Sequence, residues 1–412
     1  MTHEPSSPAD DSRRPLAPRR PHLIRDDAEA LAAARDLAAA FLEGAVARDR
    51  ERNLPWDEVE RFTASGLGGI TVPREFGGAD VSFATLAEVF ALLSAADPAL
   101  GQIPQNHFGV LALLREAGTQ EQRARFFGDV LAGHRIGNAG PERNRTSITD
   151  MTTRLAATPE GLRLSGRRYY STGAIFAHWI PTRALDDESR PVQAWVRRNA
   201  PGVTVIDDWT SFGQRTTASG SVVFEAAPVE PGAVIPVHAF ADRPGLAGPV
   251  SQFVHAAIDL GIARAAFADA LAFVRDHSRP WMDSGVERAV DDPTLRREFG
   301  RLAAALHAAE AVVAETAETL EAVAAEPVTA ESSARASVAV AEAKVLTGEA
   351  AVGIAETLFD VAGSSATRAA HGLDRHWRNA RVHTLHDPVR WKLHLLGNYR
   401  LNGVAPRRHQ WN

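Results

Sequence analysis

Residues 375–392 read Arg-His-Trp-Arg-Asn-Ala-Arg-Val-His-Thr-Leu-His-Asp-Pro-Val-Arg-Trp-Lys, and no other stretch of the chain is as dense in titratable, aromatic and turn-forming residues. His376, His383 and His386 stand with Asp387 among several arginines. Such a cluster can hold an anion and move protons near neutral pH. A plain alternative stays open, because an Asp-Pro step is also a common helix start in which the carboxylate accepts backbone N–H bonds.

The composition of the whole chain indicates an enzyme for small molecules. Its 412 residues, 45% of them hydrophobic, suffice for a large core. The net charge of −6 gives no electrostatic footprint for nucleic acid or an anionic membrane. There is no cysteine, which excludes disulfides, thiolate zinc sites and thiol nucleophiles. We therefore expect no metal site, and catalysis by other side chains or by a cofactor, in the cytoplasm.

The N-terminus and the hydropathy pattern predict neither a signal peptide nor a membrane span. Residues 1–22 are rich in Pro, Ser, Asp and Arg and lack an apolar segment, so we predict a disordered tail. No apolar run is long and uninterrupted enough to cross a bilayer.

The remaining chain divides into three segments by its periodicity. Residues 23–135 carry apolar residues at helical spacing, which predicts an N-terminal helical domain. Residues 136–245 change to period-two alternation with frequent turn residues, which predicts an antiparallel β domain with strands near 162–171, 192–197, 202–206 and 219–229. Residues 246–412 return to long helices, expected over 250–277, 293–325 and 330–361, with Asp292 and Thr329 at helix starts.

Five short motifs lie at points where these segments turn. Each has an ordinary structural reading when taken alone: a polar loop, a cross-strand pair, a core tryptophan, a surface arginine and a glycine helix cap. They are Ile-Gly-Asn-Ala-Gly-Pro-Glu-Arg-Asn at 136–144, Tyr-Tyr-Ser-Thr-Gly-Ala at 169–174, Asp-Asp-Trp-Thr-Ser-Phe-Gly-Gln-Arg-Thr-Thr-Ala-Ser-Gly-Ser at 207–221, Arg-Pro-Trp-Met-Asp-Ser-Gly-Val-Glu at 279–287, and Gly-Ser-Ser-Ala-Thr at 363–367.

These motifs and the order of the three segments resemble the acyl-CoA dehydrogenase superfamily from about residue 25 to residue 411. Within it, the sequence is most similar to the reduced-flavin monooxygenases that include dibenzothiophene monooxygenase and sulfur-acquisition oxidoreductases. The resemblance implies an α+β fold with an N-terminal helical domain, a middle antiparallel β domain and a C-terminal four-helix bundle.

The resemblance also implies which residues bind a flavin. Asn138 corresponds to a residue along the edge of the flavin ring, where an amide both donates and accepts hydrogen bonds. Thr172 takes the place of a hydroxyl that faces flavin N5, with Ser171 beside it, and Trp209 that of an aromatic residue against the ring. A guanidinium can hold a phosphate with two hydrogen bonds, so Arg279 is expected on the phosphate of a flavin in a neighbouring subunit. The same role is expected for Gly363, Ser364 and Ser365.

The catalytic residues implied by the resemblance are His107, Thr172, His386 and Asp387. His107 corresponds to a histidine of the substrate cavity in related monooxygenases. Arg378-Asn-Ala-Arg381 matches the helix that precedes the catalytic glutamate of the dehydrogenases, but Thr384-Leu-His-Asp-Pro388 stands where the glutamate string belongs. Loss of that carboxylate removes the base for an acyl α-proton, which favours oxygenation over dehydrogenation.

The resemblance implies the activity of a two-component monooxygenase. It also implies that the protein is a homotetramer. It would use O₂ and reduced FMN, in preference to FAD, supplied by a separate NAD(P)H-dependent flavin reductase, to oxygenate a small organosulfur compound in sulfur acquisition. No Gly-x-Gly-x-x-Gly dinucleotide fingerprint is evident, which argues against direct use of NAD(P)H. Three alternatives stay open: an acyl-CoA dehydrogenase with a displaced base, an FMN-dependent N- or C-hydroxylase of another substrate, and a flavin-binding protein without catalysis.

Overall fold

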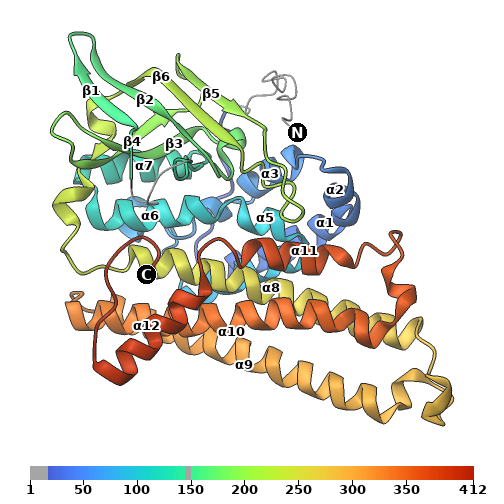
Figure 1. Ribbon diagram of the computed structural model, residues 1–412. Helices are drawn as coiled ribbons and strands as arrows, with labels where there is room; N and C mark the ends of the chain where they lie inside the picture. Colours follow the sequence, from blue (N-terminus) through green and yellow to red (C-terminus); the bar gives the residue numbers. More distant parts are fainter. Residues whose placement is uncertain (1–16, 144–149) are drawn as a thin grey trace.

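Helices form both ends of the chain and a sheet forms its middle in the computed structural model, which describes residues 17–143 and 150–412 (Figure 1). The first helices begin where side-chain oxygens can cap them: Asp26, Ser82 and Thr119 each accept a hydrogen bond from a backbone N–H of the following turn. The N-terminal helices are α1 (Asp27–Leu42), α2 (Ala45–Glu51), α3 (Trp56–Ala64), α4 (Phe83–Ala96), α5 (Pro98–Gln102), α6 (Gln105–Ala117) and α7 (Gln120–Leu131).

The middle segment forms one seven-stranded sheet in the order β5-β6-β2-β1-β3-β4-β7. The α+β class is confirmed, but the expected purely antiparallel sheet is wrong, because β1 pairs with β3 in parallel through Arg154 and Leu185. The strands are β1 (Arg154–Thr158), β2 (Gly161–Arg168), β3 (Trp179–Leu185), β4 (Pro191–Arg197), β5 (Val203–Ile206), β6 (Ser221–Val229) and β7 (Val234–Ile235).

Strand β3 was not predicted because its sequence carries two contrary signals. Its residues are almost all buried, so there is no alternation of polar and apolar side chains, and Pro181 lies in its interior. The structure tolerates this proline because part of β3 has only isolated bridges on one side, from Ile136 to Trp179 and from Ala139 to Thr182. The neighbouring strand β1 was also missed, whereas β4, β5 and β6 lie where alternation predicted strands.

Aromatic rings join the N-terminal helices to the sheet. Phe126 of α7 is fully buried and stacks on Trp195 of β4 with ring centroids 4.0 Å apart. Trp179 of β3 meets Phe126 edge-on at 5.3 Å, and its indole N–H donates to Asp129 at 2.8 Å. Stacked and edge-on aromatic pairs add to the free energy of burial, so this group fixes α7 on the sheet.

The C-terminal segment is built on three long helices, of which α8 and α10 are mostly buried and α9 is buried along one side only. Asp292 and Thr329 cap α9 and α10 as predicted. Helix α8 packs against α4, α9 and α10, and Gly261 permits the crossing with α4, because a Cβ there would lie 2.4 Å from the carbonyl oxygen of Ala91. Figure 1 shows α12 crossing the long helices, and α11 packs against α8 and α10. The elements are α8 (Ala247–Asp276), α9 (Pro293–Ala324), α10 (Ala330–Ala362), α11 (Asp374–His383) and α12 (Val389–Asn402).

The expected N-terminal tail lies outside the described residues as far as residue 16. The described chain begins at residue 17 and lies against the helical domain, where the backbone N–H of His22 donates to the carbonyl of Ala64 at 3.0 Å. Along residues 17–143 and 150–412, no helix combines the length and the apolar character that a membrane span requires.

We expect the Phe126→Ala variant to lose about 3–5 kcal/mol of unfolding free energy, because it removes a buried ring from between two tryptophans. Denaturant unfolding followed by tryptophan fluorescence, at one fixed protein concentration, measures the loss. Leu42→Ala is the control, since Leu42 is 57% exposed and its truncation should change stability by no more than ~0.5 kcal/mol. Equal effects of the two substitutions would contradict the role of this aromatic group.

Candidate active site

A polar cluster lies inside the C-terminal helices, where apolar residues would be the rule. His255 and Asp259 are four residues apart and therefore share one face of α8, and both are buried. Lys344 on the facing helix α10 and His383 at the end of α11 are buried with them. The turn at 384–388 and the first residues of α12 complete the cluster with His386, Asp387 and Lys392.

The two lysines of this cluster are the only lysines in the chain, and every other cationic side chain of the 45 Lys and Arg is an arginine. Arginine suits exposed and forked ion pairs, whereas lysine is a compact point charge that is readily perturbed when buried. The restriction of both lysines to one buried site is a signal of the site that the sequence analysis did not use.

Asp387 is an ionised carboxylate held by positive and donor groups. The ammonium nitrogens of Lys344 and Lys392 lie 3.8 and 3.7 Å from its oxygens, and His386 Nδ1 lies 3.3 Å away. With its amide nitrogen turned to the carboxylate, Gln252 donates at 3.2 Å to both oxygens. Burial opposes ionisation, but Lys344, His386 and Lys392 together outweigh it and lower the pKa of Asp387 below its usual range.

The helix-cap interpretation of Asp387 is wrong. Helix α12 begins at Val389 with Pro388 in the N-cap position, and no side-chain hydrogen bond within the described chain caps it. The carboxylate points instead into the cluster, because two buried ammonium groups attract it more strongly than the partial charge of a helix end.

A second carboxylate–histidine pair lies deeper. Asp259 Oδ1 is 2.5 Å from His383 Nδ1, and His383 Nε2 is 3.0 Å from His255 Nδ1. The ring of His255 packs against that of His386, with centroids 4.0 Å apart. Asp259, His255 and Lys344 were not among the predicted site residues, because only the fold brings α8 and α10 to the turn at 384–388.

Three loops meet at one end of the sheet, and they carry most of the predicted flavin-binding residues. The amide of Asn138 lies 3.5 Å from the carbonyl of Tyr170, and the Ser171 N–H donates to the carbonyl of Gly220 at 3.0 Å. The ring of Tyr170 meets Trp209 edge-on at 6.1 Å. Asn138, Ser171, Thr172 and Trp209 are therefore neighbours, as the resemblance implied. Asn144 of the first motif lies outside the described residues.

The two neighbouring hydroxyls differ in availability. Thr172 Oγ1 is 2.7 Å from Ser219 Oγ, which in turn bonds Thr217 Oγ1 at 2.7 Å. Ser171 Oγ is buried, and no partner for it is found in the described part of the chain. A buried hydroxyl without a partner costs free energy, and a hydrogen bond to a ligand would recover it. Ser171 is thus the hydroxyl without a partner among the described residues, while Thr172, bonded once, keeps acceptor capacity, and its expected role at the flavin stays a prediction.

The loop 207–221 connects the sheet to α11. The Gln214 N–H donates to Asn379 at 2.6 Å, and Arg378 donates to the carbonyl of Phe212 at 2.9 Å. The side-chain amide of Gln214 is buried, and across residues 17–143 and 150–412 neither of its polar atoms has a hydrogen-bond partner. It is a further ligand-binding candidate that the sequence did not single out.

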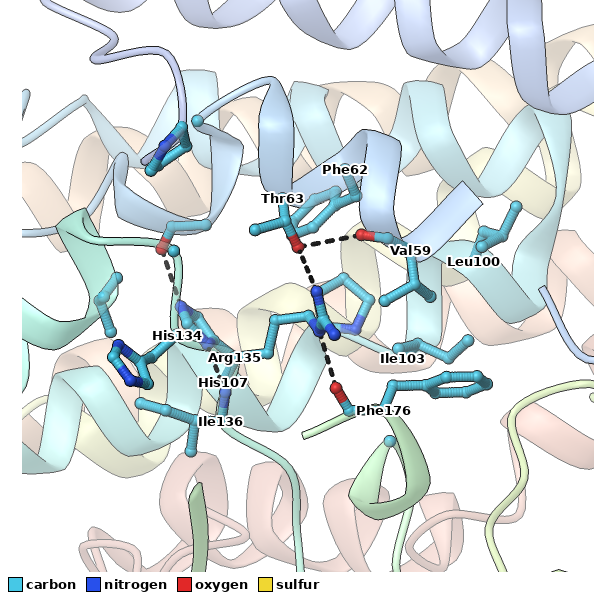
Figure 2. Close-up of a pocket in the computed structure, with 17 residues that line it drawn as sticks. Val59, Phe62, Thr63, Leu100, Ile103, His107, His134, Arg135, Ile136 and Phe176 are labelled. Carbon is cyan, nitrogen blue, oxygen red and sulfur yellow. Dashed lines mark hydrogen bonds between the residues drawn. The ribbon is translucent and has the colours of Figure 1, made fainter. Parts of the chain in front are cut away.

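His107 lies beside a small cavity between α3, α6 and the segment 134–136, with about 40 Å³ of space for water (Figure 2). Its Nδ1 accepts from the Ile136 N–H at 3.1 Å, so its Nε2 carries the proton and donates to the carbonyl of Gly68 at 2.8 Å. Burial lowers the pKa of His107 to about 4, which keeps the ring neutral. In this structure both ring nitrogens of His107 bond to backbone groups, and its catalytic role stays a prediction.

Arg279 and Gly363–Ser365 lie together but far from the three loops. Ser278, before Arg279, donates to the carbonyl of Ala362 at 3.2 Å. Figure 1 shows the ends of α8 and α10 at the side of the molecule away from the sheet. Arg279, Ser364 and Ser365 are exposed, so one chain alone does not bring them to Asn138 and Ser171.

Comparisons with known proteins give two family matches and full-length relatives. Residues 25–134 match the N-terminal domain of acyl-CoA dehydrogenase, and residues 253–391 match its C-terminal domain. Dibenzothiophene monooxygenase of Rhodococcus erythropolis is 33% identical over 410 residues, covering 95% of this chain and 98% of that protein. The "Probable FMNH2-dependent monooxygenase SfnC" of Pseudomonas putida is 30% identical over 386 residues, covering 92% and 96%.

A solved structure extends the likeness to three dimensions. The crystal structure of FMN-bound TdsC from Paenibacillus sp. A11-2 superposes with a TM-score of 0.89 at 32% identity, covering 93% of this chain and 100% of that one. The arrangement of helices, sheet and loops described above is therefore shared with a flavin-binding protein along nearly its whole length.

Lys392 should lose its proton near pH 8 in the folded protein. Burial lowers its pKa from 10.5 to about 8, with Asp387 opposing and Lys344 assisting. Lysine labelled with ¹⁵N at Nζ gives signals from only two side chains, and the signal lost in Lys392→Met should titrate with a midpoint near 8. A midpoint above pH 10 would show that the site does not destabilise the ammonium.

The same titration has a consequence for stability. Because the folded pKa lies below the unfolded one, the unfolded chain binds more protons between about pH 8 and 10.5. The unfolding free energy of the parent relative to Lys392→Met should therefore rise with pH in that window, by at most ~1.4 kcal/mol per pH unit.

Proposed function

This chain belongs to the acyl-CoA dehydrogenase superfamily, in the branch of the dibenzothiophene monooxygenases, and we propose that it is the oxygenase component of a two-component flavin monooxygenase. Its substrate is a small organosulfur compound, and its physiological role is sulfur acquisition. The relatives support this assignment, since their names specify dibenzothiophene oxygenation and dependence on FMNH2.

The observation that most supports the monooxygenase proposal is the environment of Asp387. A dehydrogenase of this fold needs a carboxylate that takes a proton from its substrate. Asp387 stands at that place in the sequence, but Lys344 and Lys392 on either side lower its pKa, so it is a weak base. This geometry disfavours the dehydrogenase alternative.

His386 is the group that this carboxylate supports. The Nδ1–H of His386 faces Asp387 Oδ1, which leaves Nε2 free for a ligand, and the side chain is 31% exposed while its carboxylate partner is only 7% exposed. The carboxylate orients the ring. His386 can thus hold or deliver a proton at Nε2 on the accessible side of the cluster.

The loops at the end of the sheet fit an FMN ring. Ser171 offers a buried hydroxyl that has no partner among the described residues, Asn138 an amide with one long contact, and Trp209 a half-buried aromatic face. Reduced FMN supplies the electrons with which O₂ is activated. The residues of the chain position the ring, exclude water from it and handle protons at His386.

The substrate assignment rests on the relatives, because a fold by itself does not determine function. Oxygen transfer to sulfur needs no substrate base, which agrees with the weak basicity of Asp387. A screen of organosulfur, amine and phenol substrates with FMN, a flavin reductase and NAD(P)H tests the assignment, and productive O₂ use only with a nitrogen or carbon substrate would favour the hydroxylase alternative.

The functional unit is inferred to be a homotetramer that receives reduced FMN from an NAD(P)H-dependent flavin reductase. In a single chain the phosphate-binding candidates lie away from the ring-binding loops, so a neighbouring protomer must bring them together. Trp281 and Met282, which follow Arg279 closely, are 68% and 83% exposed, and Trp391 and Leu401 are exposed on α12. Exposed apolar surface of this extent is typical of an interface. Because the electrons come from an NAD(P)H-dependent reductase, we infer that the protein is located in the cytoplasm.

Arg279→Ala should weaken FMN binding by about 1.5–3 kcal/mol, the range for hydrogen bonds to a charged group. Titration of the purified oligomer with FMN, followed by flavin fluorescence, gives the dissociation constant. Arg275→Ala is the matched control, because Arg275 is exposed in the last turn of α8. An unchanged dissociation constant in Arg279→Ala would make Arg279 an ordinary surface residue.

His386→Ala should retain FMN binding but reduce product formation by ~10²-fold or more, the scale of one positioned acid–base group. Reduced flavin would then reduce O₂ to hydrogen peroxide without forming product. The ratio of product to hydrogen peroxide per O₂ consumed measures this, with the best organosulfur substrate from a screen that includes dibenzothiophene. His394→Ala, on α12 and outside the cluster, is the control. Full product yield in His386→Ala would exclude the proton role.

A further inference from the structure

Three buried groups of the cluster form a line that the proposed function has not used. Asp259 Oδ1 contacts His383 Nδ1 at 2.5 Å, and His383 Nε2 contacts His255 Nδ1 at 3.0 Å. The side chains of Asp259 and His383 have no exposed surface, and His255 is 1% exposed. Two helices supply the line, since Asp259 and His255 belong to α8 and His383 ends α11.

The order of donors and acceptors along this line determines where the protons lie. A carboxylate only accepts, so His383 carries its proton on Nδ1 and its Nε2 is an acceptor. His255 must then donate from Nδ1, which leaves its Nε2 without a proton. Both rings are neutral in this arrangement. Burial agrees with that state: it lowers the pKa of His255 well below its usual value, with His386 and Lys344 adding to the effect, and it lowers that of His383 although Asp259 opposes it.

The line ends on a basic nitrogen that has nothing to accept from. His255 Nε2 is buried, and no hydrogen-bond partner for it occurs in residues 17–143 and 150–412. The His386 ring lies against His255, so this nitrogen belongs to the same site as the outer histidine. Around the line, Lys344 faces Asp259 at 3.7 Å and Asp387 at 3.8 Å, and Lys392 and His409 lie beyond Asp387. A buried acceptor left unpaired costs free energy, which indicates a donor in the working enzyme.

We propose that His255 Nε2 is a second proton-accepting group of the site, and that Asp259 and His383 are positioning residues that keep it unprotonated. Its partner is an N–H or O–H donor, either of reduced FMN or of a water molecule bound in the site. The inference rests on the proposed function only for the use of this nitrogen in turnover. The proton positions are a property of the chain alone.

The variant Asp259→Asn tests the relay because an amide can reverse it. The amide nitrogen donates to His383 Nδ1, His383 then donates from Nε2, and His255 is left with its proton on Nε2. Asp269→Asn is the matched control: Asp269 also comes from α8 and bonds a buried histidine of α11, His376, at 2.7 Å, but it lies outside the line. If Asp259→Asn does not fold, Asp259→Asn with Lys344→Met removes both buried charges and tests the same reversal.

The readout is the ¹⁵N NMR spectrum of histidine-labelled, flavin-free protein. The parent and Asp269→Asn should show His255 Nε2 as an unprotonated nitrogen, and Asp259→Asn should show it protonated. Addition of reduced FMN without oxygen separates the two donors: a shift of the Nε2 signal assigns the donor to the flavin, and a hydrogen-bonded signal already present without flavin assigns it to water. A protonated Nε2 in the parent would overturn the proposal, and so would an Nε2 signal that shows no hydrogen bond before or after reduced FMN is added.

Turnover gives the second, separate test. Asp259→Asn should form product at least ~10-fold more slowly than the parent, while Asp269→Asn stays within ~2-fold. Reversed protons with unchanged turnover would remove His255 from the reaction. Lack of organosulfur oxidation by the parent, together with the expected proton positions, would contradict the proposed function and leave the relay standing.

Discussion

The ammonium group of Lys344 is the constraint around which the C-terminal helices are organised. It has no exposed surface and lies between two carboxylates, Asp259 at 3.7 Å and Asp387 at 3.8 Å. An unpaired charge at this depth would cost several kcal/mol, so α8, α10 and the turn at 384–388 can pack only where both carboxylates reach it. Each carboxylate then contacts Nδ1 of one histidine, which places His383 and His386.

This arrangement explains how one fold can serve oxygenation in place of dehydrogenation. A carboxylate that acts as a catalytic base needs a pKa that matches its task. The two lysines lower the pKa of Asp387 and so make it a weaker base. The carboxylate contacts His386 instead, and in the proposed function the proton transfer belongs to that imidazole. The same scaffold of long helices and sheet thus changes its chemistry through a few buried charges, without a change in its architecture.

The residues proposed to bind the flavin ring and those proposed to bind its phosphate lie in two places that one chain does not join. The loops around Asn138 and Ser171 are fastened to α11 through Gln214 and Asn379, so the proposed ring-binding residues lie next to the helix that carries His383. Arg279 stands at the other end of α8, a helix of 30 residues and therefore about 45 Å long. Assembly of protomers is the simplest way to complete the cofactor site.

Local sequence determined the helices of the chain, several strands and the position of the reactive turn, because periodicity, caps and Asp-Pro steps act over a few residues. It did not predict β3, whose burial on both faces hides alternation, nor the parallel pairing of β1. It also left Asp387 open between a helix cap and a site residue, favoured Thr172 over Ser171, and gave His107 a catalytic role. Those questions depend on which partner is nearest in space: two lysines for Asp387, Ser219 for Thr172, and backbone groups for His107. Apart from Lys392, which is five positions from Asp387, these partners are 29 to 47 positions away in the sequence, so only the tertiary structure decides the contacts.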